Sequence, residues 1–85
     1  MMTDEQLDAG FRCVDCDVHT GDINEYYMVK DHVWKDAGME PNGGMLCIGC
    51  LETRLGRTLR ALDFSTAPIN FLAGHSDRLE NRMNT

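Results

Sequence analysis

Two stretches of the chain, FRCVDC (residues 11–16) and GGMLCIGC (residues 43–50), contain all four of its cysteines. Two residues separate the cysteines within each stretch, and thirty residues separate the two pairs. A C-x2-C pair occupies one edge of a tetrahedral zinc site, and two such pairs close the shell without leaving an open position. The pattern therefore predicts one structural Zn²⁺ held by Cys13, Cys16, Cys47 and Cys50.

Two alternatives for these cysteines stay open at this point. The pairs could form disulfides or a redox motif, although a redox C-x2-C usually follows a strand in a βαβ unit and needs only one pair. His19, three residues after Cys16, could also replace one sulfur in the shell. The acidic start of the chain does not resemble a secretory signal. We therefore expect a cytoplasmic protein, and a reducing compartment favours metal-bound thiolates over disulfides.

Length and charge narrow the class of protein. A chain of 85 residues with 42% hydrophobic residues predicts a single domain whose small core needs support from a metal, a disulfide or a partner. The formal net charge is −6, and residues 1–22 contain six acids against one arginine. This charge opposes general nucleic-acid binding, which depends on phosphate contacts. No apolar run is long enough to span a bilayer, so we expect no membrane association.

The rest of the sequence predicts short elements around the cysteines. They are an N-terminal arm (1–10), a strand (23–29), a helix (32–37) capped by Asp31, a PNGG turn (41–44), a main helix (48–62), a strap (63–75) and a last helix that Ser76 caps and that runs to Met83 with Leu79 inward. The main helix carries an apolar stripe of Ile48, Leu51, Leu55, Leu59 and Leu62, and the strap is expected to be anchored by Ile69, Phe71 and Leu72.

The sequence predicts a metal-binding turn, or knuckle, over residues 11–22, then a hairpin-like middle, then a cysteine pair at the start of a helix. This order of elements is called a treble clef. The predicted fold is thus a small α+β zinc finger, with a treble-clef domain over residues 11–62 and a C-terminal strap and short helix over residues 63–85.

Several other residue groups are candidates for function. On the predicted main helix, Arg54, Arg57 and Arg60 lie opposite the apolar stripe, where they could grip phosphate or an acidic partner or form a solvated face. The aromatic residues of the middle segment could build the core or a binding surface, namely Tyr26, Tyr27 and Trp34, together with Met28. His32 and His75 are expected to be exposed rather than catalytic. The acidic N-terminal third could bind a basic partner or keep the protein soluble.

Two resemblances emerge from these motifs. The two C-x2-C pairs, Asp31-His32 and the GMLC segment resemble recombination endonucleases of the phage endonuclease VII type, which implies an HNH-like nuclease on a zinc-bearing treble clef. Val33 and Trp34 stand where that family repeats Asp-His, and Leu51 stands at its Asn position, so its base and metal positions are largely missing. The segments YMVKDHVW, GGMLCIGCLETRLGRTL and SDRLENRM are similar to a family of small bacterial and phage proteins of uncharacterised function, which implies no activity.

Three functions are compatible with the sequence. The first is a non-catalytic structural-zinc protein that binds a protein partner and is encoded by a phage or mobile element. The second is a nucleic-acid-binding zinc finger that uses Arg54, Arg57 and Arg60, a hypothesis that the net charge disfavours. The third is a divergent HNH-like nuclease that uses His32. The closed metal shell and the lack of a catalytic set favour the first.

Overall fold

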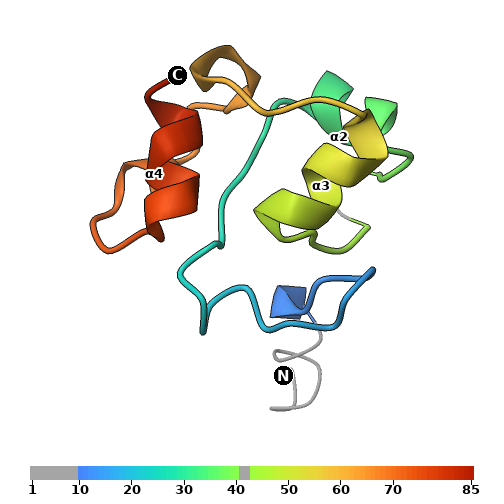
Figure 1. The fold of residues 1–85 in the computed structure, drawn as a ribbon, viewed down its shortest axis with the longest axis horizontal. Coiled ribbons are helices and arrows are strands. Elements are labelled where there is room, and N and C mark those ends of the chain that lie inside the picture. Colours follow the sequence, from blue (N-terminus) through green and yellow to red (C-terminus); the bar gives the residue numbers. More distant parts are fainter. Residues whose placement is uncertain (1–9, 41–42) are drawn as a thin grey trace.

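The computed structural model describes residues 10–40 and 43–85, so most of the expected N-terminal arm and the first half of the PNGG turn lie outside the described residues. The helices, in chain order, are α2 (Asp31–Asp36), α3 (Ile48–Leu55), the 3-10 helices η1 (Ala61–Asp63) and η2 (Pro68–Phe71), and α4 (Asp77–Met83). In the described chain, β-structure is limited to three isolated bridges, which join Arg12 to His19, Cys13 to Met45 and Val29 to Phe64. The molecule is thus mainly irregular backbone that connects short helices (Figure 1).

The core lies where α2 and α3 meet the extended segment 23–30. In Figure 1 this segment runs between α4 on one side and α2 and α3 on the other. The side chain of Tyr27 is fully buried, and its ring lies 6.1 Å from that of Trp34 and 5.9 Å from that of Phe64. Its hydroxyl donates a hydrogen bond of 2.8 Å to the carbonyl of Leu46, so the one polar atom of this ring is satisfied. The predicted aromatic residues Tyr27 and Trp34 therefore belong to the core.

The helix α3 is shorter than the sequence predicts. Its buried face carries Ile48 and Leu51, as expected, but it ends at Leu55 instead of residue 62. Gly56 takes the left-handed conformation (φ 72°) and its N–H donates to the carbonyl of Glu52, which is how many helices end. The predicted stripe therefore breaks, and Leu62 is 76% exposed.

The two short helices agree with the sequence. In α2 the side chains of Val33 and Trp34 are buried, although Lys30 rather than Asp31 is the N-cap residue and no side chain caps this end. In α4 the hydroxyl of Ser76 accepts from the N–H of Leu79, and Leu79 is fully buried. The N-cap hydroxyl satisfies one of the amides that a helix start leaves unpaired.

Segment 23–29 is extended, but within the described residues its β-pairing is limited to the single antiparallel bridge between Val29 and Phe64, so the predicted strand is wrong. A side chain supplies a further partner. The amide of Asn70 accepts from the N–H of Met28 at 2.9 Å and donates to its carbonyl at 2.7 Å, while it also donates to the carbonyl of Ser65. Asn70 is 8% exposed, so a buried amide does what a neighbouring strand would do.

The C-terminal strap is also anchored differently from the prediction. Phe71 and Leu72, two of its three expected anchors, are 75% and 57% exposed, and Ile69 is half-buried. The buried residue of η2 is instead Asn70. The strap is therefore held by polar bonds to segment 23–30, and two large apolar side chains remain in solvent.

A buried carboxylate joins segment 23–30 to both α3 and α4. The carboxyl of Glu25 accepts from the backbone N–H of Ile48, the hydroxyl of Ser76 and the guanidinium of Arg78 at distances of 2.7 to 3.2 Å. A Cβ at Gly49 would lie 3.0 Å from the Arg78 guanidinium, so the absence of a side chain there leaves room for this contact. Burial raises the pKa of Glu25, but the bonds from Arg78, Ser76 and Ile48 outweigh it and hold the pKa below its usual value.

We expect Glu25→Gln to destabilise the protein by about 2 kcal/mol, because a neutral amide cannot satisfy the same three donors and leaves Arg78 without its partner. Urea denaturation at pH 7 measures this change. Asp36→Asn is the matched control, since Asp36 is exposed and has no direct ion pair among the described residues. Equal stability of the two variants would contradict the role of Glu25.

The pH dependence of this stabilisation has a definite sign. Because folding lowers the pKa of Glu25, its contribution is complete above the ordinary value of 4.5 and is lost as the pH falls through the lower folded pKa. The difference in unfolding free energy between wild type and Glu25→Gln should thus be constant above about pH 5 and shrink below it. Comparing the two proteins at each pH cancels the titration of every other group. A difference that grows in acid would be the opposite result.

Candidate metal centre

The fold brings the four cysteine sulfurs into one cluster. Their Sγ atoms all lie within 4.8 Å of one another, and those of Cys16 and Cys47 are 3.8 Å apart. Four sulfurs around a tetrahedral zinc at about 2.3 Å would be separated by about 3.8 Å. A disulfide needs a sulfur separation of about 2.05 Å, and all four cysteines are free. The arrangement could therefore hold a metal ion.

The first pair lies on a tight turn after the bridge at residue 12. The N–H of Cys13 donates to the carbonyl of Val18, and the N–H of Asp17 donates back to the carbonyl of Cys13. Asp17 closes the turn in the left-handed region (φ 66°), which aspartate tolerates better than most residues. The Arg12 guanidinium donates to the Asp17 carbonyl at 2.8 Å. This turn points Cys13 inward, where it is buried, and leaves Cys16 exposed.

The second pair begins α3. Cys47 is the N-cap residue of this helix and Cys50 lies in its first turn. The parallel bridge between Cys13 and Met45, with a 2.9 Å bond from the Val14 N–H to the Met45 carbonyl, holds the knuckle against this helix start. Backbone amides at a helix N-terminus favour negative charge, so this position suits thiolates.

The cysteines differ in acidity. Burial opposes ionisation of Cys13, but the backbone N–H groups of Cys47, Cys16 and Asp15 outweigh it and lower the pKa of Cys13 to about 7. Burial raises the pKa of Cys47, and burial with thiol hydrogen bonds raises the pKa of Cys50. Four thiolates this close repel one another unless a cation neutralises them, so the set is chemically suited to a bound metal.

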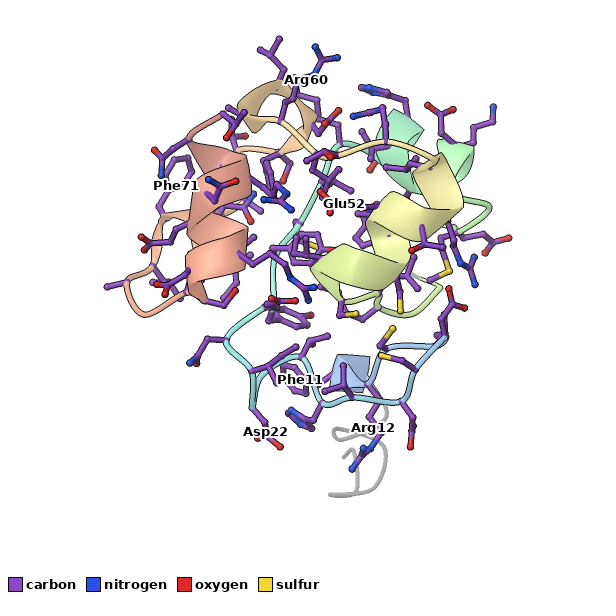
Figure 2. All side chains as sticks on the ribbon, in the orientation of Figure 1. Phe11, Arg12, Asp22, Glu52, Arg60 and Phe71 are labelled. Atoms are coloured by element: carbon purple, nitrogen blue, oxygen red, sulfur yellow. The ribbon has the colours of Figure 1, made fainter. Side chains whose placement is uncertain are left out.

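The predicted arginine face does not exist, because the helix ends before two of its members. Arg54 is on α3, where its guanidinium forms two bonds of 2.8 and 2.7 Å to Asp15 and a third to the Ala37 carbonyl. Arg57 lies beyond the helix end and forms an equally short bidentate pair with Asp63. Arg60 points away from the body of the molecule (Figure 2) and, in the described chain, has no ion pair.

The three histidines lie outside the sulfur cluster. The Nδ1 of His19 accepts from the N–H of Asp22 at 3.2 Å, and its ring stacks on Phe11. His32 is exposed on α2, and the His75 ring nitrogen lies 3.1 Å from the carbonyl of Ile69. Within the described residues, only the four cysteines gather into a group that could hold a metal ion. No histidine is therefore placed with acidic residues as a second metal site in that part of the chain.

Sequence reasoning missed the roles of three carboxylates, two that contact this centre and one that ties α3 to the C-terminal part of the chain. Asp15 lies between the first two cysteines and ties their turn to α3 through Arg54. Glu25 reaches the N–H of Ile48, inside the second cysteine pair. Glu52 accepts from the N–H of Leu59 and from Arg82, each at 2.7 Å. Only their burial or pairing reveals these roles, because each partner is distant in sequence or follows the helix end.

No family model, no curated protein and no solved structure matches this chain. In the part of the chain that the structure describes, no helix combines the length and the apolar character needed to cross a bilayer.

We expect Arg54→Ala to weaken retention of metal severalfold, because it releases the turn of Cys13 and Cys16 from α3 without removing a ligand. Competition with a chromogenic chelator measures retention. Arg60→Ala is the matched control, since this arginine lacks an ion pair within residues 10–40 and 43–85. Equal retention by both variants would show that the Asp15 pair does not support the centre.

Proposed function

We propose that Cys13, Cys16, Cys47 and Cys50 hold one structural Zn²⁺, and that the chain acts as a non-catalytic protein-interaction module. The observation that carries this proposal is the closure of four sulfurs within 4.8 Å, with those of Cys16 and Cys47 at the 3.8 Å separation that a tetrahedral ion needs. Bound there, the ion supplies charge neutralisation and a cross-link between two chain segments. A shell filled by four protein ligands leaves no position for substrate or water, which is typical of structural zinc.

Zinc fits this donor set better than the other common metals. An all-sulfur tetrahedral site favours Zn²⁺ or iron, whereas oxygen-rich octahedral sites favour Mg²⁺ and Ca²⁺. Two C-x2-C pairs in one short chain are also typical of zinc-binding fingers. The proposal places the protein in a reducing compartment such as the cytoplasm, because the thiolates must escape oxidation.

The treble-clef assignment is part of the same proposal. Its support is the order of the elements that carry the ligands, namely a turn with the first pair, a bridge from Cys13 to Met45 and a helix that begins at the second pair. The middle of the chain departs from a regular hairpin, since segment 23–29 is paired by Asn70. The likeness thus concerns the two ligand-bearing segments.

An interaction role is supported by the pairing of the arginines within the fold and by the lack of a catalytic cluster among the described residues. Of the arginines that could contact phosphate, Arg54 and Arg57 are both in bidentate pairs with carboxylates. The described histidines do not join a cluster of acids that could activate water. Several large apolar side chains are also exposed to solvent, namely Val14, Leu62, Phe71 and Leu72. Phe71 and Leu72 are neighbours, and contiguous exposed apolar residues on a small protein are typical of binding surfaces.

Native mass spectrometry tests the metal proposal. Protein purified without added metal should carry one zinc per chain, lose it to a strong chelator and unfold, because the ion contributes folding free energy. Cys16→Ser should retain much less zinc, and since Cys16 is exposed this change leaves no cavity in the core. His19→Ser is the control and should retain zinc as the wild type does, because His19 is outside the cluster.

A metal-free chain would contradict the zinc proposal. If its mass were lowered by the hydrogens lost on disulfide formation, the cysteines would be assigned to disulfides instead. Substitution with Co²⁺ adds a spectroscopic check, since tetrahedral thiolate coordination gives intense visible absorption that octahedral coordination does not.

A further inference from the structure

A hollow lies between the C-terminal strap and α4. Its volume is about 450 Å³, and its wall contains about as many polar side chains as apolar ones. Phe71, Leu72, His75 and Glu80 are among the residues that line it. A second hollow of about 180 Å³ shares Leu72 and His75 with the first. Leu72 therefore lies between the two hollows, and with its neighbour Phe71 it forms an exposed apolar ridge at the edge of the larger one.

The ridge is exposed because the backbone holds it outward. Phe71 and Leu72 are 75% and 57% exposed, and Figure 2 shows Phe71 beside α4, on the side away from α3. Their neighbour Asn70 is 8% exposed and makes three hydrogen bonds to Met28 and Ser65. On the other side, the N–H of Ser76 donates to the carbonyl of Asn24 at 2.8 Å. Because both flanks are tied down, the ridge costs little ordering entropy on binding.

The charge around the ridge is negative and unpaired. Glu80 lines the larger hollow and, among the described residues, its carboxylate has no ion pair. Asp77, one helical turn earlier and on the same face of α4, is in the same state. The arginines of α4, Arg78 and Arg82, are both engaged by carboxylates of other elements. An incoming group therefore meets an apolar ridge beside carboxylates that are free to pair.

These charges discriminate between occupants. A second copy of this chain carries a net charge of −6 and would bring acids against acids. Nucleic acid and anionic lipid are repelled for the same reason. A basic segment of another protein is attracted, and its apolar side chains can enter the two hollows.

We propose that the ridge of Phe71 and Leu72 binds a partner segment that carries an aromatic or leucine side chain next to lysine or arginine. The apolar side chain fills the larger hollow, and the cationic group pairs with Glu80. This inference rests on the proposed interaction function and names the surface and the chemistry of its partner.

The test uses the full chain in its metal-loaded form and a phage-displayed library of random peptides. Selected peptides should combine a basic residue with an adjacent aromatic or leucine residue. A fluorescent synthetic peptide of that consensus should bind at least about tenfold more weakly to Phe71→Ser and to Glu80→Lys. Leu72→Ser provides a second variant of the ridge. Because Phe71, Leu72 and Glu80 are exposed, these changes should preserve zinc content and thermal unfolding.

Matched controls separate the ridge from general effects. Val14→Ser removes an apolar side chain that is 53% exposed on the cysteine-bearing turn. Asp36→Lys reverses an exposed charge on α2, so it changes the net charge as much as Glu80→Lys does. Both should bind the consensus peptide within about twofold of the wild type.

Several results would overturn the proposal. They are a library that yields no consensus, a consensus rich in acids, or peptides that bind Phe71→Ser as tightly as the wild type. A wild-type dimer in sedimentation that dissociates in Phe71→Ser would assign the ridge to a second copy instead. Any of these results with a full zinc content would disprove the proposed binding surface alone. A folded protein without zinc would instead disprove the proposed metal function.

Discussion

The convergence of four cysteine sulfurs is the constraint on which the rest of this structure depends. Their closure within 4.8 Å brings a turn at residues 13–16 against the start of α3, thirty residues later. The chain between them becomes a loop that contributes Tyr27, Val33 and Trp34 to the core. Since the described chain has only isolated bridges, no ladder of hydrogen bonds fixes the relative position of these segments. In a domain this small, a metal ion bound by this cluster would be a cross-link that substitutes for a sheet.

Three buried or half-buried carboxylates form a second set of ties, and they share one pattern. Each accepts a backbone N–H at the start of a segment and also pairs with the guanidinium of an arginine. The backbone donors to Glu25, Glu52 and Asp63 are those of Ile48, Leu59 and Arg60, respectively. The paired guanidinium groups are, in the same order, those of Arg78, Arg82 and Arg57. Figure 2 shows Glu52 directed from α3 toward the middle of the molecule. A buried carboxylate is costly unless several donors satisfy it, so each tie requires its arginine. Arg57, one of the arginines that the sequence predicts as a contact for nucleic acid, is engaged in this way.

The sequence predicts the local features and misses the tertiary ones. Cysteine spacing foretells the cluster, and Ser76 with Leu79 foretells α4, because ligand spacing and helix capping act over a few residues. Periodicity extends α3 to residue 62, since leucine spacing does not register that Gly56 ends the helix. Segment 23–29 has strand composition, but its partners are the side chain of Asn70, 42 residues from Met28, and a single bridge from Val29 to Phe64. A pair as distant as Glu25 and Arg78 leaves no local pattern.

The metal centre and the C-terminal surface are linked through Glu25. This carboxylate bonds to the N–H of Ile48, the residue that follows Cys47, and to Ser76 and Arg78 at the start of α4. In the proposed zinc-bound form, the ion fixes the start of α3, so the Ile48 N–H stays in place and Glu25 keeps its full set of donors. Losing the ion would free that helix start, and Glu25 could then lose the Ile48 N–H as a donor. An unsatisfied buried carboxylate is unfavourable, so the contact of Glu25 with Ser76 and Arg78, which holds α4, would weaken. The ridge of Phe71 and Leu72 lies against α4, so in the proposed zinc-bound form its shape would depend on an ion with whose ligands it shares no residue.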